Sequence, residues 1–412
     1  MTATATGAGP PEPPGPPGRV GAVVTGVGVL SAAGRGLAAL TEAAAHGKAA
    51  FGPVTRFDVS ARRTTRAALL ADSLLTDSPS TDSLSADSRP ADALVTGAAR
   101  TAGTVLDAIA QACLQAGLTA AEGAALPVLL ALHSDERTRA VTDAVASGVR
   151  ARHGAPGVTR VYTGACVAAA TAVADAAALV AAGRHERVLV AAGHLVGPGV
   201  FAVFDAGRAL ARDGELRPFS AGRSGTLLGD AAAAVVVEAA PAAERRGASA
   251  LARLAGWGRS GDAHHVCRPE PDGTGVSRAI EAALARAGVA PAEVGYVNAN
   301  GTGSTLSDHA EARALRRVFG PHTDRLPVSS SKSVHGHALE ASALLELAVT
   351  IGALGTGLLP VNAGWLGPDP DLGPDLALDL VLDGPRAARP AYALSLNSAF
   401  GGANTALLLA PG

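Results

Sequence analysis

The segment from Val167 to Gly183 constrains this chain more than any other, because its sequence, VAAATAVADAAALVAAG, contains almost no large side chain. Alanine favours helix, so the segment is predicted to be helical. Aromatic residues make up only 3% of the 412 residues. The core must therefore be built by small residues whose backbones approach closely. With 48% hydrophobic and 17% charged residues, the chain has the balance of a globular protein rather than a disordered one.

Strand-like and helix-like segments alternate from residue 19 onward. Residues 1–18 are proline-rich and are expected to form a disordered tail. Residues 71–92 repeat Asp-Ser every five positions, a period that fits neither helix nor strand, so we expect an Asp/Ser-rich surface loop. The remainder divides into two α/β halves, residues 19–250 and 251–412.

The pattern of apolar residues and turn formers predicts individual elements. A closing hairpin is expected over the last segment, YALSLNSAFGGANTALLL. The predicted strands are 23–30, 126–132, 187–193, a segment within 225–240, the segment VGYVNANGTG and the segment LPVSSSKS. The predicted helices are 37–46, 101–116, a stretch ending near 152, 167–183, 276–287, 307–318 and a long one over about 337–354.

Charge, cysteine content and the N-terminus exclude several classes of function. Lys plus Arg (34) nearly balances Asp plus Glu (36), so no long-range attraction for nucleic acid or anionic lipid is expected. The three cysteines are odd in number and lack a CxxC spacing, which argues against disulfides and a zinc site. No signal peptide or membrane-spanning run is apparent, so we expect a cytoplasmic protein. We also expect it to need neither a metal nor a cofactor.

Cys166 lies between a strand-like segment and the start of the small-residue helix. The positive end of a helix dipole stabilises a thiolate and lowers its pKa, so a nucleophilic role is predicted there. The alternative is a buried structural cysteine, which is the interpretation we give to Cys113 and Cys267.

Two later turns carry polar side chains after predicted strands: VNANGTGSTLSDHAE and SSSKSVHGHALEASALLE. The second turn places His337 at an expected helix start, with Lys332 before it and Glu346 further along the helix. His337 could bind a carbonyl oxygen, while Lys332 and Glu346 could form a partly buried pair. A capped helix with a solvated ion pair is the alternative.

Eight motifs follow one another in the order found in a known family. They are TGVGVLS, GKAAFGPVTRFD, TGACVAAATA, RPFSAGRSGTLLGDAAAAVVVE, GDAHHVCRPEPDG, VNANGTGSTLSDHAE, SSSKSVHGHALEASALLE and NSAFGGANTALLL. In this order the chain resembles the β-ketoacyl-acyl-carrier-protein synthase family of condensing enzymes. The resemblance implies a thiolase-like fold, with two similar α/β halves layered α-β-α-β-α.

The resemblance also implies roles for individual residues. Cys166 holds the place of the cysteine that accepts an acyl chain from an acyl carrier protein. Gly336-His337, with Lys332 before and Glu346 behind, matches the family's second histidine turn. Phe400, Gly401 and Gly402 match a gating Phe-Gly-Gly turn whose backbone N–H groups, with that of Cys166, resemble an oxyanion hole.

The chain departs from the family at three places. Asn300 stands where a histidine usually helps to decarboxylate the malonyl extender, and an amide cannot accept a proton near pH 7. Residues 133–165 form a shortened version of the segment that usually helps to form the dimer interface and the acyl tunnel. The Asp-Ser repeat also replaces a basic and aromatic stretch.

Three functions stay open at this point. The first is an acyltransferase of polyketide or fatty-acid synthesis, acylated on Cys166, with condensation weakened by Asn300. The second is a partner subunit like a chain-length factor, and the third is a non-elongating acyl transferase. An acyl carrier protein is the expected partner, and the chain is expected to pair as a homodimer or as a heterodimer with another ketosynthase.

Overall fold

Strand β1 (Ala22–Ser31) is buried along its whole length and lies near the middle of a long sheet. The computed structural model describes residues 21–75, 90–153 and 157–412, so the expected tail and most of the Asp-Ser repeat lie outside the described residues. The sheet order is β6-β5-β7-β8-β1 through the first half and β9-β16-β15-β10-β11-β13 through the second. The strands of the path besides β1 are β5 (Val128–Leu132), β6 (Val158–Tyr162), β7 (Arg187–His194), β8 (Ala231–Ala239), β9 (Ala252–Gly261), β10 (Val294–Asn298), β11 (Pro327–Ser329), β13 (Asp379–Leu380), β15 (Tyr392–Ser398) and β16 (Ala403–Pro411).

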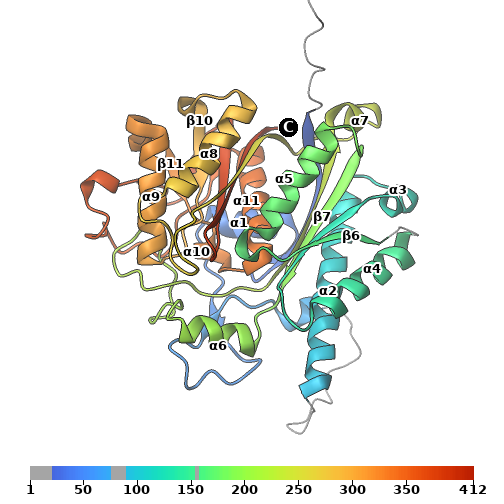
Figure 1. Cartoon of the computed structure of the whole chain (residues 1–412), viewed down its shortest axis with the longest axis horizontal. Helices are drawn as coiled ribbons and strands as arrows, with labels where there is room; N and C mark the ends of the chain where they lie inside the picture. The colour runs from blue at the N-terminus through green and yellow to red at the C-terminus, as the bar shows by residue number, and fades with distance from the viewer. Residues whose placement is uncertain (1–20, 76–89, 154–156) are drawn as a thin grey trace, which may run out of the picture.

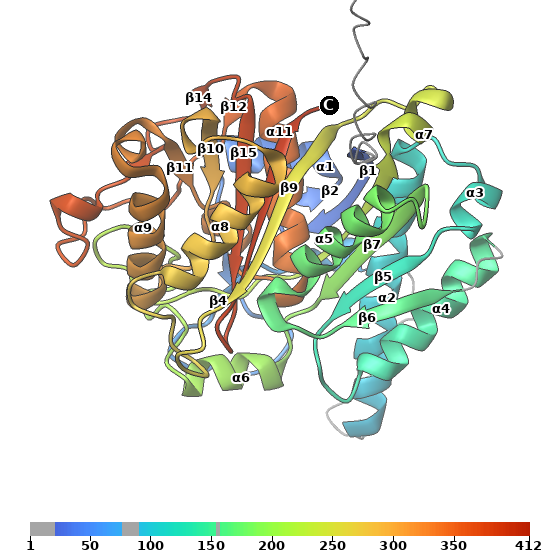
Figure 2. The same cartoon turned by 45° about the horizontal axis from the view of Figure 1, so that its top comes forward.

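The two halves of the sheet enclose a central layer of two helices. Strands β1 and β9 pair only over Ala22–Val24, and beyond these residues the halves diverge. Helices α5 (Ala168–Ala181) and α11 (Ser342–Thr356) contact strands of both halves, and Figure 2 shows α5 between β7 and β9. Because α5 consists almost wholly of alanine and valine, sheets can approach it from both sides.

Two outer layers of helices complete the arrangement (Figure 1). Helices α2 (Pro90–Gln115) and α4 (Thr138–His153) cover the first half, while α8 (Thr274–Ala287) and α9 (Thr305–Phe319) cover the second. The predicted α-β-α-β-α thiolase-like fold is therefore confirmed. The other elements are α1 (Leu37–Ala45), α3 (Ala120–Ala124), α6 (Pro198–Ala206), α7 (Ala240–Arg245), α10 (Lys332–His335), the short strands β2 (Gly34–Arg35), β3 (Gly52–Pro53), β4 (Arg66–Ala67), β12 (Leu358–Leu359) and β14 (Arg386–Ala387), and 3₁₀ turns that include η1 (Asp72–Leu74), η2 (Ala165–Val167) and η5 (Leu339–Ala341).

The two halves repeat one packing device. A Cβ on Gly28 of β1 would lie 1.9 Å from the carbonyl oxygen of Ala108 in α2, and a Cβ on Gly258 of β9 would lie 1.8 Å from that of Ala279 in α8. No real Cβ makes such contacts, so each outer helix rests directly on a glycine of its strand. The similarity supports two related halves, and we propose that they meet at residue 250, between α7 and β9.

This packing predicts a large difference between two glycines of β9. Gly258→Ala should destabilise the protein by about 1–3 kcal/mol or more, because the methyl group pushes α8 away from the sheet. Gly261→Ala is the control, because a Cβ there meets nothing within 4 Å, and its effect should stay within about 0.5 kcal/mol. Urea unfolding of both variants measures the difference, and equal stabilities would contradict the repeated device.

Several sequence predictions differ from the structure. Helix α2 begins at Pro90, earlier than expected, since proline suits a first helical turn and needs no N–H partner there. Residues 90–92 are therefore helical, not part of the surface loop. Strand β9 was not predicted. The helix expected from His337 begins only at Ser342, because Gly336 (φ 73) and Leu339 (φ 44) turn the chain first.

One helical stretch is as long and apolar as a membrane-spanning helix, although no such run was expected from the sequence. Among the described residues, Leu339–Thr356 is long and apolar enough to span a membrane by length and composition, with a mean hydropathy of 1.4. In the structure, 83% of this stretch is buried inside the fold, where it forms η5 and the central helix α11. Burial between two sheets accounts for its composition.

Candidate active site

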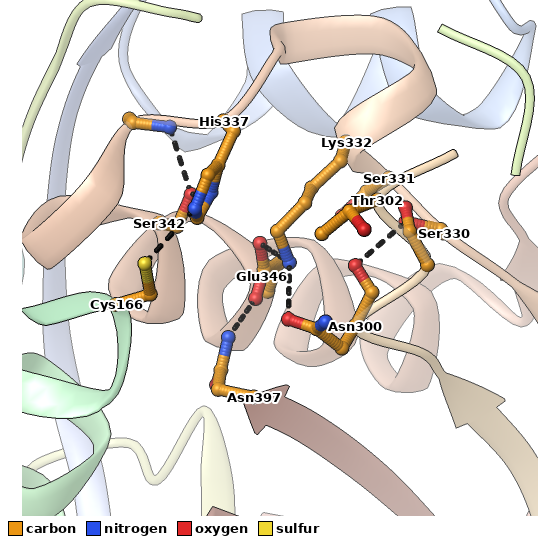
Figure 3. A network of polar contacts seen from close by, with 12 residues as sticks. Cys166, Asn300, Thr302, Ser330, Ser331, Lys332, His337, Ser342, Glu346 and Asn397 are labelled. Carbon is orange, nitrogen blue, oxygen red and sulfur yellow. Dashed lines mark hydrogen bonds and ion pairs between the residues drawn. The ribbon is translucent and has the colours of Figure 1, made fainter. Parts of the chain in front are cut away.

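The expected site residues come together at one edge of the sheets (Figure 3). Cys166 lies in η2, directly before α5, and Asn300 follows β10. Lys332 begins α10, which follows β11, while Glu346 projects from α11. Turns from both halves of the sheet, together with the central helix α11, thus bring together residues separated by up to 180 positions.

Cys166 and His337 form a buried pair. The sulfur lies 3.0 Å from Nε2 of His337, and the two residues are 6% and 4% exposed. Burial raises the pKa of Cys166 to about 12, and Glu340 adds to this effect. Burial, reinforced by the positive charge of Lys332, lowers the pKa of His337 well below its usual value. The predicted lowering of the thiol pKa by the helix dipole was therefore wrong, since burial outweighs it; the resting pair is a thiol and a neutral imidazole.

Ser342 orients the imidazole of His337. Its Oγ lies 3.0 Å from Nδ1 of His337 and accepts a hydrogen bond of 2.8 Å from the N–H of Ala338. A hydroxyl can either donate to Nδ1 or accept from it, so Ser342 supports both neutral tautomers of the ring. His337 can therefore take up a proton at Nε2 or donate one there without moving.

Lys332 and Glu346 form an ion pair that is shut off from solvent. Nζ lies 2.6 Å from Oε1 of Glu346, and both side chains are fully buried. The amide of Asn397, at the end of β15, donates to the second carboxylate oxygen. Burial raises the pKa of Glu346, while Lys332 and Asn397 act against that rise. The pair is buried rather than solvated, so the alternative of a solvated ion pair does not apply.

The network determines which end of the Asn300 amide faces the cavity. Its Oδ1 accepts from Nζ of Lys332 at 3.3 Å and from the N–H of Ser398 at 3.2 Å. Both neighbours are donors, so the acceptor must be the oxygen. Asn300 also lines the cavity that holds Cys166 and His337. The amide N–H₂ group is therefore the part left to donate to a substrate.

Two carboxylates that the sequence analysis missed hold the Asn300 turn. Glu311 accepts from the N–H groups of Asn300 and Gly301 at 2.7 and 2.8 Å. Asp308 accepts from those of Thr302 and Gly303 at 3.1 and 3.2 Å. Burial raises their pKa values to about 7 and about 6, respectively. Their three-residue spacing at the start of a predicted helix, directly after a glycine-rich turn, was a usable signal.

The Phe400 turn contributes less than expected. The N–H of Gly401 donates to Val266 O at 2.7 Å and that of Gly402 to Ala399 O at 3.1 Å, so neither is free for an oxyanion. Phe400 is 51% exposed, lines the cavity and lies against Phe204 with ring centroids 5.9 Å apart. This geometry suits a gate, and the expected oxyanion hole cannot include the N–H groups of Gly401 and Gly402.

The site opens into a cavity of about 560 Å³ that Cys166, Asn300, His337 and Phe400 line together. Arg208 and Arg268, both exposed, line the same cavity. Apolar side chains pack around the cysteine, among them Val200, Phe201, Leu228 and Leu339. The arrangement combines a nucleophile, a neutral base, hydrogen-bond donors and apolar walls, which are the parts of a site for acyl transfer through a covalent thioester.

Comparison with known proteins agrees with this site. The β-ketoacyl synthase N-terminal domain matches residues 21–243, and the β-ketoacyl synthase C-terminal domain matches residues 251–365. The chain therefore belongs to the β-ketoacyl synthase family, which has the thiolase-like fold.

Individual relatives show how far the similarity extends. Nodulation protein E of Rhizobium meliloti is 38% identical over 272 residues, which cover 65% of this chain and 66% of that protein. The 3-oxoacyl-[acyl-carrier-protein] synthase 2 of Coxiella burnetii is 39% identical over 193 residues, 47% of this chain and 46% of the synthase. The chain thus spans just under two thirds of the first relative's length. The ishigamide ketosynthase/chain length factor superposes with a TM-score of 0.82 at 26% identity, over 96% of this chain and 100% of that one.

Proposed function

We propose that this chain is a condensing-enzyme-type acyltransferase of polyketide or fatty-acid synthesis that is acylated on Cys166. The observation that carries the proposal is the 3.0 Å contact between the Cys166 sulfur and Nε2 of a neutral His337 in a substrate-sized cavity. A cysteine whose burial raises its pKa needs a base in the transition state, and His337 is placed to serve as one.

The transfer step follows from this contact. The Cys166 sulfur attacks the thioester carbonyl and gives its proton to Nε2 of His337, while Nδ1–H donates to Ser342 Oγ. The N–H groups of Cys166 and Phe400 stabilise the oxyanion. When the C–S bond to the leaving thiol breaks, His337 returns the proton to that thiol. An acyl-Cys166 thioester and a free thiol are formed.

Asn300 limits the second half of the reaction. Its N–H₂ group can bind the thioester oxygen of a malonyl unit, as a neutral imidazole N–H would. An amide cannot become cationic, however, so it stabilises an enolate less well when CO₂ leaves. We propose that loading of Cys166 is retained and that decarboxylative condensation is weakened.

Asn300→His tests this weakening. We expect CO₂ release from malonyl-carrier protein to rise about tenfold, which corresponds to about 1.4 kcal/mol in the barrier. Release of radiolabelled CO₂ measures the rate, with Asn300→Asp as the matched variant that lacks an N–H donor. If a folded Asn300→His variant still loads Cys166 but releases CO₂ only at the background rate, the proposal of a weakened condensing enzyme is refuted. That result would support a non-elongating transferase.

A chain-length-factor-like subunit is the second candidate. One relative in structure is a ketosynthase/chain length factor, which favours it. The intact Cys166–His337 pair and the buried Lys332–Glu346 pair argue against it, since a non-catalytic subunit needs neither. Failure of Cys166 to load under any condition would favour this candidate.

We propose an acyl carrier protein and a second ketosynthase-type chain as partners. The exposed Arg208 and Arg268 at the cavity suit the phosphate of a phosphopantetheine arm. Strand β6 ends the sheet path, and its Thr159 and Arg160 are exposed, so the edge is open for pairing. Light scattering should give a dimer, alone or with a co-expressed ketosynthase, and a monomer in both cases would contradict pairing.

We propose the cytoplasm as the location of this protein. All three cysteines are free, which suits a reducing compartment.

A further inference from the structure

We propose that Glu340, His194 and His133 form a second polar site beside Cys166 that binds a hydroxyl group on the acyl chain. The inference rests on the proposed acylation of Cys166 and specifies which acyl groups the protein prefers. None of these three residues takes part in the transfer step described above.

The three side chains converge at the ends of two neighbouring strands. His133 follows β5, His194 ends β7, and Glu340 lies in η5, which contacts both strands. Nδ1 of His133 lies 2.9 Å from Oε1 of Glu340, and the two imidazole rings pack edge to face at 6.2 Å. The Glu340 side chain is only 3% exposed and that of His133 35%.

The charges of the cluster are well defined. The hydrogen bond to Glu340 raises the pKa of His133. Burial alone would favour the protonated form of Glu340, yet the hydrogen bond from His133 keeps its pKa below the usual value. Burial lowers the pKa of His194 to about 4. At neutral pH the cluster therefore contains a carboxylate and, in His194, an uncharged imidazole.

The cluster lies close to the reacting sulfur. Glu340 belongs to η5 and Cys166 to η2, and these two turns contact each other. Leu339, the residue before Glu340, packs in the same apolar cluster as Cys166. The charge of Glu340 also acts on the Cys166 thiol and raises its pKa. The proposal places the acyl chain beyond the cavity that Cys166 lines, on a path past Leu339 toward β5 and β7.

Two buried atoms of the cluster have no hydrogen-bond partner within the described residues: Oε2 of Glu340 and Nε2 of His194. His194 is 2% exposed. A buried polar atom without a partner is costly, so the site favours a ligand that supplies one. A hydroxyl group is the kind of ligand that can serve both atoms, because it can donate to a carboxylate and accept from an imidazole N–H. An alkyl chain of the same length leaves both unsatisfied.

The experiment compares acyl donors that differ only in the hydroxyl. The protein is incubated with N-acetylcysteamine thioesters in pairs of equal carbon number, 3-hydroxybutyryl with butyryl and 6-hydroxyhexanoyl with hexanoyl. Intact-mass analysis follows formation of the Cys166 thioester and release of N-acetylcysteamine. We expect one hydroxyacyl donor to react about tenfold faster than its partner or more, since sites that hydrogen-bond a hydroxyl reject analogues without it. Equal rates within both pairs, as expected if a trapped water or a second chain already satisfies the cluster, would overturn the proposal.

Variants assign the preference to the cluster. Glu340→Ala and His194→Ala should each reduce it to less than about threefold, because one hydrogen bond to the hydroxyl is lost. Glu42→Gln, an exposed surface change, should keep it. An unchanged preference in both folded cluster variants would overturn the assignment.

A binding measurement separates this inference from the proposed function. In Cys166→Ala, which cannot be acylated, hydroxyacyl thioesters should raise Tm more than their alkyl partners do. If no donor loads the native protein but this difference persists, the proposed function fails and the hydroxyl site stands. If the native protein loads all donors and the difference is absent, the hydroxyl site fails alone.

Discussion

Cys166→Ala should abolish the mass increase that the native protein shows after incubation with an acyl-carrier-protein thioester. The variant removes the only sulfur within reach of His337 Nε2 among the described residues, so no covalent intermediate can form. The alanine methyl is smaller than the thiol side chain, and the surrounding apolar residues of η2 and η5 should hold the fold. Intact-mass spectrometry gives the result directly.

The other two cysteines provide matched controls. Cys113 is buried against the outer face of the first half-sheet, where burial raises its pKa to about 11, and Cys267 is exposed. Cys113→Ala and Cys267→Ala should both retain full acylation. If the mass increase persists in Cys166→Ala but is absent in Cys267→Ala, the nucleophile is Cys267, which also lines the cavity, and the proposal for Cys166 is wrong.

Glu346→Gln should lower the free energy of unfolding by about 3–5 kcal/mol, because it leaves the buried ammonium of Lys332 without a counter-charge. Both side chains are fully buried, 2.6 Å apart, and after the change Lys332 has only neutral amide oxygens, those of Asn300 and of the new glutamine, as acceptors among the described residues. Urea unfolding measures the loss.

An exposed pair offers the control. Lys48 and Glu42 lie 3.1 Å apart, but their side chains are 63% and 66% exposed. Glu42→Gln should therefore cost less than about 1 kcal/mol. The double variant Lys332→Met/Glu346→Leu should recover most of the stability lost in Glu346→Gln, because no charge is left buried. Equal losses in Glu346→Gln and Glu42→Gln would show that the buried pair is neutral or hydrated.

Local patterns predicted most of the candidate site. The cysteine before a small-residue helix and the Lys332, His337 and Glu346 spacing were visible because each is carried by one turn or one helix. Ser342, Asp308 and Glu311 were missed, although they stand only 5, 6 and 11 positions along the chain from His337, Thr302 and Asn300, which they hold. Their roles depend on turns at Gly336 and Gly301 that bend the chain back on itself, which a helical or strand period does not reveal.

The eight ordered motifs of the sequence predicted the layered fold through the family resemblance that they carry. The structure shows why the sequence permits it, since small residues in α5 and glycines in β1 and β9 allow contacts that larger side chains would block. The sequence also predicted that Cys166 and His337 belong to one site, and the structure places them in contact. Only the tertiary structure decided their protonation, because the burial that raises the pKa of Cys166 comes from turns some 170 residues apart. It likewise decided that the Asn300 oxygen faces Lys332 and Ser398, and that Glu340 meets His133 and His194. Hydrogen bonding and desolvation depend on neighbours in space, and a linear pattern records only neighbours along the chain.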